Sequence, residues 1–216
     1  MNPLPKSLII FDWILVIYTL VSILLLLLKK KSDYKFLHFT RLIFSDTYIK
    51  TYKSDSLFKG FHIVLNIIAV LLFPLLLLLV VTKLFSFDEI LFSSYMKYLF
   101  FFSTFYFTKL ALQLFFAKLF NCKKLIYAYV FQKQTYFTYL CFLSLLPALL
   151  LIFTPFSNNI SLYVFTILWI VLFSLSLILT FFRFKEVLLS QLLYFILYIC
   201  TFEISPIIGV IYFTRL

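Results

Sequence analysis

Glycine is nearly absent from this chain, with only Gly60 and Gly209 among 216 residues. Walker-type and dinucleotide-binding loops need several glycines within a few positions, so the sequence excludes both kinds of nucleotide site. The same scarcity excludes GxxxG packing, in which small residues let transmembrane helices approach closely. Helices of this chain must therefore pack through larger side chains, chiefly Leu and Phe.

Cysteine and histidine are scarce as well. The three cysteines, Cys122, Cys141 and Cys200, are widely spaced and form no CxxC pair, which argues against a disulfide framework. The two histidines, His38 and His62, lack the HxxxH or HExxH spacing of zinc sites. No metal ion or cofactor is therefore expected.

Motifs of membrane-embedded enzymes are missing too, because the sequence has no GxGD, EExxxR, HxxxxD or GxSxG. Nothing in the sequence indicates an enzyme, and a lipid-modifying enzyme is the weakest functional interpretation.

Hydrophobic residues are what the chain has in excess. They make up 64% of it, whereas charged residues make up only 12%, compared with about 45–50% and 25% in soluble domains. A bilayer core of about 30 Å takes about 20 apolar residues in a helix. The sequence therefore predicts an all-α, polytopic transmembrane helix bundle with six spans, at residues 8–28, 61–81, 98–119, 136–153, 160–182 and 188–213. The fourth segment is the shortest and the third the least apolar, so five spans is the competing count.

The distribution of basic residues predicts the orientation. Lys and Arg in short loops stay on the cytoplasmic side, and most of the 19 basic residues lie in segments 29–60, 118–133 and 183–185. Both termini are accordingly expected outside the cytoplasm, and the first span is expected to be retained rather than cleaved as a signal peptide. The net charge of +11 then matches a cytoplasmic face lying against anionic lipid, and no nucleic-acid partner is expected.

Residues 29–60 form the one sizeable segment between spans, and their pattern is amphipathic. Phe36, Phe39 and Ile43 recur at near-helical spacing, with Lys35 and Arg41 between them. This pattern predicts one or two helices in the cytoplasmic headgroup layer. Two interpretations remain open: a simple interfacial connection between two spans, or a docking surface for a partner.

Three ionisable residues lie within predicted spans, where each costs about 2.5–3.5 kcal/mol unless it is paired or hydrated. At about 1.5 Å per residue, Lys109 is about 16 Å from Tyr98 and Glu203 about 15 Å from Phe213, the outer ends of their spans. Both are therefore expected at the bilayer midplane, where they can form an ion pair between the third and sixth spans. Asp12 lies only about 6 Å into the first span and can reach the outer headgroups.

Polar groups surround both members of this predicted pair. Pro206 leaves a backbone carbonyl beside Glu203 without its helical donor, and Ser205 is adjacent. Gln113 lies one turn from Lys109 on the same helix face. The pair is either a structural link that sets helix register or a site for protons or a solute.

The stretches FYFTKLALQLFFAKLF, around Lys109, and YFILYICTFEISP, around Glu203 and Pro206, carry a resemblance. With the chain length and span pattern, they resemble an uncharacterised family of multi-pass inner-membrane proteins from Bacteroidota that has only a domain-of-unknown-function label. The resemblance implies a bacterial inner membrane. It implies no activity, cofactor or catalytic residue.

The function that these observations favour is an accessory or assembly subunit of an envelope complex. The small extramembrane mass and the lack of small-residue packing favour action through a membrane-protein partner or a homo-oligomer. The alternative is a small transporter or proton-coupled element that uses Lys109 and Glu203.

Overall fold

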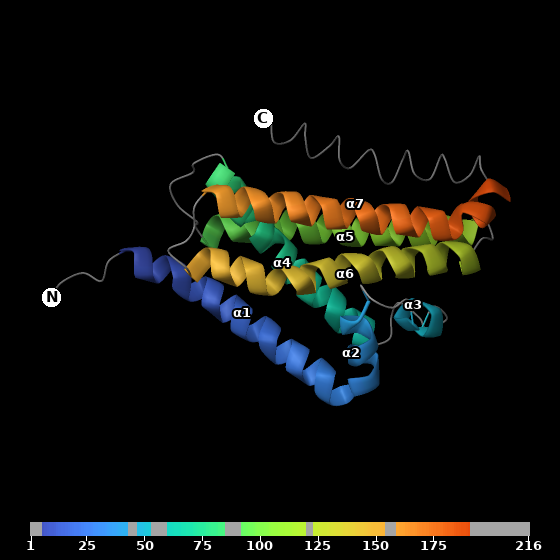
Figure 1. The fold of residues 1–216 in the computed structure, drawn as a ribbon, viewed down its shortest axis with the longest axis horizontal. Coiled ribbons are helices and arrows are strands. Elements are labelled where there is room, and N and C mark those ends of the chain that lie inside the picture. Colours follow the sequence, from blue (N-terminus) through green and yellow to red (C-terminus); the bar gives the residue numbers. More distant parts are fainter. Residues whose placement is uncertain are drawn as a thin grey trace.

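The computed structural model describes residues 6–42, 47–52, 60–84, 92–119, 123–153 and 159–190, and every regular element among them is a helix (Figure 1). The prediction of an all-α fold is confirmed. The helices are α1 (Lys6–Lys31), α2 (Asp33–Thr40), α3 (Thr47–Tyr52), α4 (Gly60–Leu84), α5 (Phe92–Leu119), α6 (Lys123–Phe153) and α7 (Asn159–Ser190).

Four of these helices are long and apolar enough to cross a membrane. Their apolar stretches are Asp12–Lys31 in α1, Gly60–Thr82 in α4, Phe92–Phe115 in α5 and Tyr163–Thr180 in α7. Helix α6 has 31 residues and is not among the four found within the described residues; its first half carries lysines, glutamines and tyrosines. The predicted sixth span, 188–213, lies outside the described residues beyond Ser190.

Three helices extend through segments that the sequence predicted to be loops. Helix α5 begins at Phe92 rather than Tyr98, α6 begins at Lys123 although a loop was expected before Tyr136, and α7 continues to Ser190. None of these extensions contains Gly or Pro, the residues that most often end a helix. Hydropathy located the apolar part of each helix, and each helix extends beyond that part into more polar sequence.

Helix α4 is the centre of the bundle. Helices α5, α6 and α7 run side by side along the long axis, and α4 crosses them in contact with all three and with α1 (Figure 1). About half of the residues in the apolar stretch of α4 are buried, a larger share than in α1, α5 or α7. The most apolar helix is therefore the one that the others surround.

The segment made of α2 and α3, hereafter the α2–α3 segment, packs against α4 and α6. The Phe39 ring, which is 0% exposed, lies edge-on to Tyr139 and Phe142 of α6, with centroids 5.5 and 5.9 Å apart. The Tyr139 hydroxyl donates a hydrogen bond of 3.2 Å to the Thr40 carbonyl. The fully buried Tyr48 of α3 places its hydroxyl 3.5 Å from Nδ1 of His62 in α4. The predicted amphipathic helices are present, and their aromatic face is buried by the protein itself.

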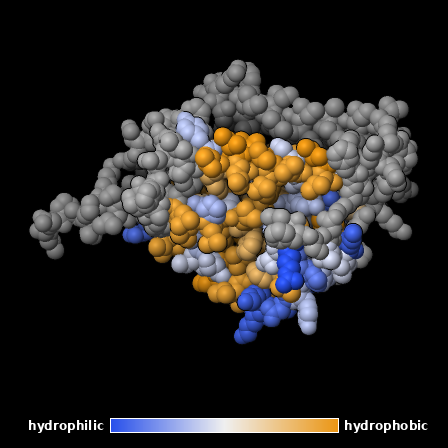
Figure 2. Space-filling model, in the orientation of Figure 1, coloured by the Kyte–Doolittle hydropathy of each residue, from blue (hydrophilic) through white to orange (hydrophobic). Residues whose placement is uncertain are grey.

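Basic residues gather at one end of the bundle. The basic end, defined by Lys29, Lys30 and Lys31 of α1, Lys50 of α3 and Lys118 of α5, lies opposite the end at which α5 and α7 begin (Figure 1). Figure 2 shows a broad hydrophobic surface with hydrophilic residues at its lower right, where α2 and α3 lie. The antiparallel order of the long helices thus collects charges that are far apart in the sequence.

Candidate functional site

A cavity of about 160 Å³ lies between α5, α6 and α7, and we call it the α5–α6–α7 pocket. Helix α6 packs against both α5 and α7, whereas α5 and α7 have few contacts with each other. The cavity is therefore a groove over α6 with α5 and α7 as its walls. Most of its surface is apolar and comes from Phe102, Phe105, Leu110, Val130, Phe137, Phe173 and Leu177.

Each wall also contributes polar side chains, which are Tyr106, Lys109, Gln113, Lys133, Gln134, Ser176 and Thr180. On α5 and on α7 these residues are three or four positions apart, a spacing that puts them on one helix face. The Gln113 side chain is 4% exposed, so it is directed into the protein. Two basic residues, Lys109 and Lys133, thus line a single, largely apolar cavity.

A chain of hydrogen bonds crosses the bundle beside the pocket. The Tyr106 hydroxyl donates to Oδ1 of Asn66 in α4, at 3.2 Å, and accepts a bond of 2.6 Å from Nε2 of Gln134 in α6. Three helices are linked in this way, which is the role that polar side chains commonly have between membrane helices. Oε1 of Gln134 is buried and has no hydrogen-bond partner in the described part of the chain.

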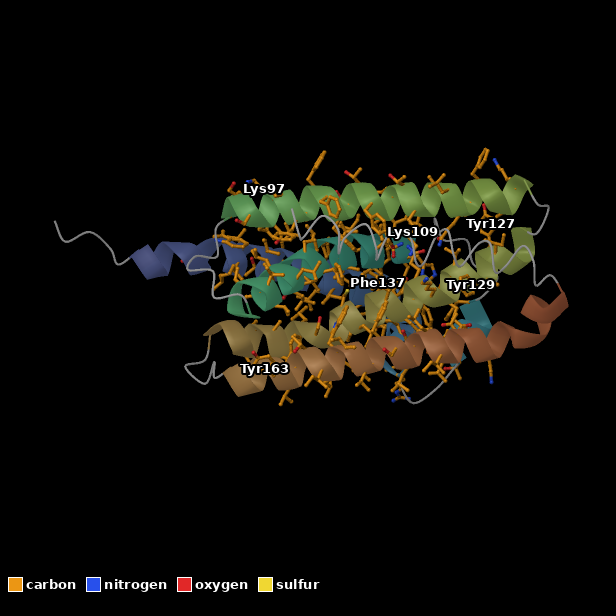
Figure 3. The ribbon with its side chains drawn as sticks, turned by 90° about the horizontal axis from the view of Figure 1, so that it is seen from above. Lys97, Lys109, Tyr127, Tyr129, Phe137 and Tyr163 are labelled. Atoms are coloured by element: carbon orange, nitrogen blue, oxygen red, sulfur yellow. The ribbon has the colours of Figure 1, made fainter. Side chains whose placement is uncertain are left out.

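Two of the hydroxyls that line the pocket form hydrogen bonds within their own helix. The hydroxyls of Ser176 and Thr180 donate to carbonyls of their own helix, those of Phe173 and Ser176, each at 2.7 Å. The Lys133 ammonium lies 5.9 Å from the centre of the Tyr129 ring, within the range of a cation–π interaction. Figure 3 shows Lys109 on the side of α5 that faces α6. The residues that line the pocket in the described part of the chain thus include two basic residues and no acidic one.

The polar residues of the pocket share one level along the bundle. At about 1.5 Å per residue, Lys109 is about 26 Å from the start of α5 and Lys133 about 30 Å from the end of α6. Thr180 is about 32 Å from the start of α7. These three helix termini lie at the same end of the bundle (Figure 1). Measured from that end of the bundle, the polar residues of the pocket therefore lie at similar heights.

The earlier start of α5 changes the interpretation of Lys109. Its midplane position was predicted from a helix beginning at Tyr98, whereas α5 begins at Phe92 and adds about 9 Å. Lys109 is accordingly about 26 Å from the start of α5 rather than about 16 Å from the outer end of the span. Lys109 lies within the apolar stretch Phe92–Phe115 of α5, and its midplane position stays a prediction.

The other predicted site residues have different positions. Gln113 lines the pocket with Lys109, whereas Asp12 is exposed on α1 and is not among the lining residues. Glu203, Ser205 and Pro206 lie outside the described residues, so the proposed ion pair stays a prediction.

Sequence reasoning missed the contributions of α6 and α7. Lys133 was counted as a basic residue of a loop, and no residue of α7 was predicted as part of a site. The run Gln132, Lys133, Gln134 directly before an apolar stretch was the available signal. Among the residues that the structure describes, no group of three His, Cys, Asp or Glu side chains is arranged to hold a metal ion.

The helical fold and the four helices of membrane-crossing length define the class, a helical protein with candidate membrane spans. The chain belongs to the family described as "Domain of unknown function (DUF4271)", which matches residues 14–214. This result confirms the predicted membership of a family with a domain-of-unknown-function label. No curated protein and no solved structure matches the chain.

Proposed function

We propose that this chain is an integral protein of a bacterial inner membrane, with its basic end in the cytoplasm, and that it works as a non-enzymatic accessory or assembly subunit of an envelope complex. The observation that carries the proposal is the length of the last three described helices. Helices α5, α6 and α7 have 28, 31 and 32 residues, whereas a bilayer core takes about 20.

The part of each helix that exceeds the thickness of the bilayer core supports a projection that binds a partner. It corresponds to about 12–18 Å of helix beyond the hydrocarbon thickness. At the basic end this length adds to the α2–α3 segment, where Lys50 and Lys118 are exposed. An ordered basic projection of this kind fits an acidic segment of another membrane protein, because opposite charges steer partners together.

The test is mild extraction of the tagged protein from its native membrane, with identification of co-purifying proteins and their stoichiometry. If the protein is a subunit, one partner should co-purify with it reproducibly and in a fixed ratio. Replacing Lys118 with Glu should lower the amount of this partner, whereas Lys97→Glu, at the opposite end of α5, should not. A lone protein in every mild detergent would argue against the subunit role.

A second candidate function is a small transporter or proton-coupled element that uses Lys109 and Glu203. The observation that favours it is the pocket beside Lys109, together with the hydrogen bonds that join Asn66, Tyr106 and Gln134. Glu203→Gln separates transport from a structural ion pair. A transport site should lose flux in proteoliposomes while the protein still accumulates, whereas a structural pair should lose folded yield.

A further inference from the structure

We propose that α4 contains a hinge at Pro74 and that Tyr95 of α5 holds this hinge in one position, with Trp13 of α1 keeping the Tyr95 ring in place. We call these three residues the hinge clamp. The clamp joins three helices and is a conformational device, independent of the subunit role and of the α5–α6–α7 pocket.

Pro74 interrupts the hydrogen bonds of α4 near the middle of the helix. Proline has no backbone N–H, so the carbonyl of Val70, four residues earlier, loses its helical donor, and the proline ring crowds that carbonyl. Sharp kinks in helices occur most often at such positions. Pro74 is buried and the following residue, Leu75, is 0% exposed. The surrounding helices rather than solvent therefore determine the conformation of this turn.

Tyr95 donates a hydrogen bond to this turn. Its hydroxyl lies 3.2 Å from the carbonyl oxygen of Leu71, the residue after Val70. In a regular helix the Leu71 carbonyl accepts a bond from the N–H of Leu75, which directly follows the proline. Tyr95 therefore bonds α4 at the turn where the helix's own hydrogen bonds are weakest. The Tyr95 side chain is 1% exposed, so bulk water has little access to its hydroxyl.

Trp13 and Phe92 hold the Tyr95 ring. The centroid of the Trp13 ring lies 5.3 Å from that of Tyr95 and 5.5 Å from that of Phe92, and the Phe92 and Tyr95 centroids are 6.3 Å apart. Aromatic pairs at these distances stabilise a fixed orientation beyond the area they bury. Nε1 of Trp13 is buried and has no hydrogen-bond partner in the described part of the chain, so ring packing is what this residue contributes.

A second hydrogen bond between α5 and α4 provides an internal comparison. The Tyr106 hydroxyl donates to Oδ1 of Asn66 at 3.2 Å, and Asn66 is about 12 Å along the helix from Pro74. Both bonds join the same two helices at the same distance, but only the bond from Tyr95 falls on the turn that the proline interrupts. The two bonds should therefore respond differently when the proline is removed.

A double-mutant cycle in the full chain tests the proposal, with the unfolding equilibrium measured by steric trapping. Tyr95→Phe should raise the unfolding equilibrium constant about threefold to tenfold. In a Pro74→Ala background the same change should have an effect below about twofold, because the alanine N–H restores the donor to the Val70 carbonyl. The control Tyr106→Phe should have the same effect in both backgrounds. Equal effects of Tyr95→Phe in both backgrounds would overturn the proposal.

Distances between spin labels keep the test decisive if the proline variant fails to fold. Nitroxide labels are attached to cysteines introduced at Ile63 and Val81, in a chain whose three native cysteines are replaced by alanine. Pulsed electron–electron resonance then reports the angle between the two halves of α4. Tyr95→Phe and Trp13→Ala should each broaden the distance distribution, whereas Tyr98→Phe, about one turn further along α5, should not. An unchanged distribution in either folded variant would overturn the hinge clamp.

Discussion

Replacing Phe39 with alanine should detach the α2–α3 segment from the bundle. The Phe39 ring is completely buried and lies edge-on to three rings, those of Tyr48, Tyr139 and Phe142. No other side chain in α2 is buried to this extent. Phe39 therefore makes the most buried contact of α2 with α6, beside the edge-on contact of Phe36 with Phe142 and the hydrogen bond from Tyr139.

The size of the effect follows from the burial of the ring. Truncation of a buried Phe to Ala costs about 3–5 kcal/mol, because transfer energy is lost and a cavity remains. Each 1.4 kcal/mol changes an equilibrium constant tenfold, so the detached fraction should rise at least about 100-fold. The total docking free energy of the segment sets the upper limit of the increase.

Limited trypsin digestion of the purified protein measures this opening. Arg41 directly follows α2 and is exposed, but cleavage requires the surrounding chain to leave the bundle. When closing is faster than cleavage, the cleavage rate follows the open fraction. The matched control is Leu37→Ala, because Leu37 lies in the same helix and is 46% exposed. A Phe39→Ala rate within threefold of this control would refute the reasoning.

Three further outcomes are expected. Tyr106→Phe removes both hydrogen bonds that join α4, α5 and α6, and should lower the unfolding free energy by about 1–2 kcal/mol, measured by steric trapping. Tyr163 is exposed, so the control Tyr163→Phe should leave the unfolding free energy unchanged. Gln132→Leu should raise the unfolding free energy by about 1–2 kcal/mol, since this side chain is 1% exposed and neither amide atom has a hydrogen-bond partner among the residues that the structure describes; a lower unfolding free energy would contradict the burial argument. Cysteines introduced at Lys50 and Lys118 should react with an impermeant maleimide from the same side of the membrane; labelling from opposite sides would disprove a common basic end.

The candidate site was predictable only in part. Lys109 and Gln113 are four residues apart in an apolar stretch, so a shared helix face followed from spacing alone. Lys133 was missed because low hydropathy before Tyr136 resembled a cytoplasmic loop, although the segment is helical. Hydropathy detects contact with lipid, and a helix that extends beyond the lipid has no such signal.

The structure of the α2–α3 segment was also predictable from the sequence only in part. The recurrence of Phe36 and Phe39 predicted an amphipathic helix, but the sequence did not identify what covers its apolar face. The covering rings, Tyr139 and Phe142, lie about 100 positions later in the chain. Headgroup lipid and a protein surface present similar chemistry to an amphipathic helix, so periodicity cannot distinguish them.

The sequence by itself determined the helical class, the apolar stretches of the four candidate spans and the identity of the charged residues. These are local properties, because helical hydrogen bonds and hydropathy depend on residues close together in the chain. Only the tertiary structure decided that Lys109 and Lys133 line one pocket, and at which level of the bundle they lie. Whether residues of two helices line one pocket depends on where each helix starts, how it is rotated and which helix it packs against. These are properties of the whole bundle.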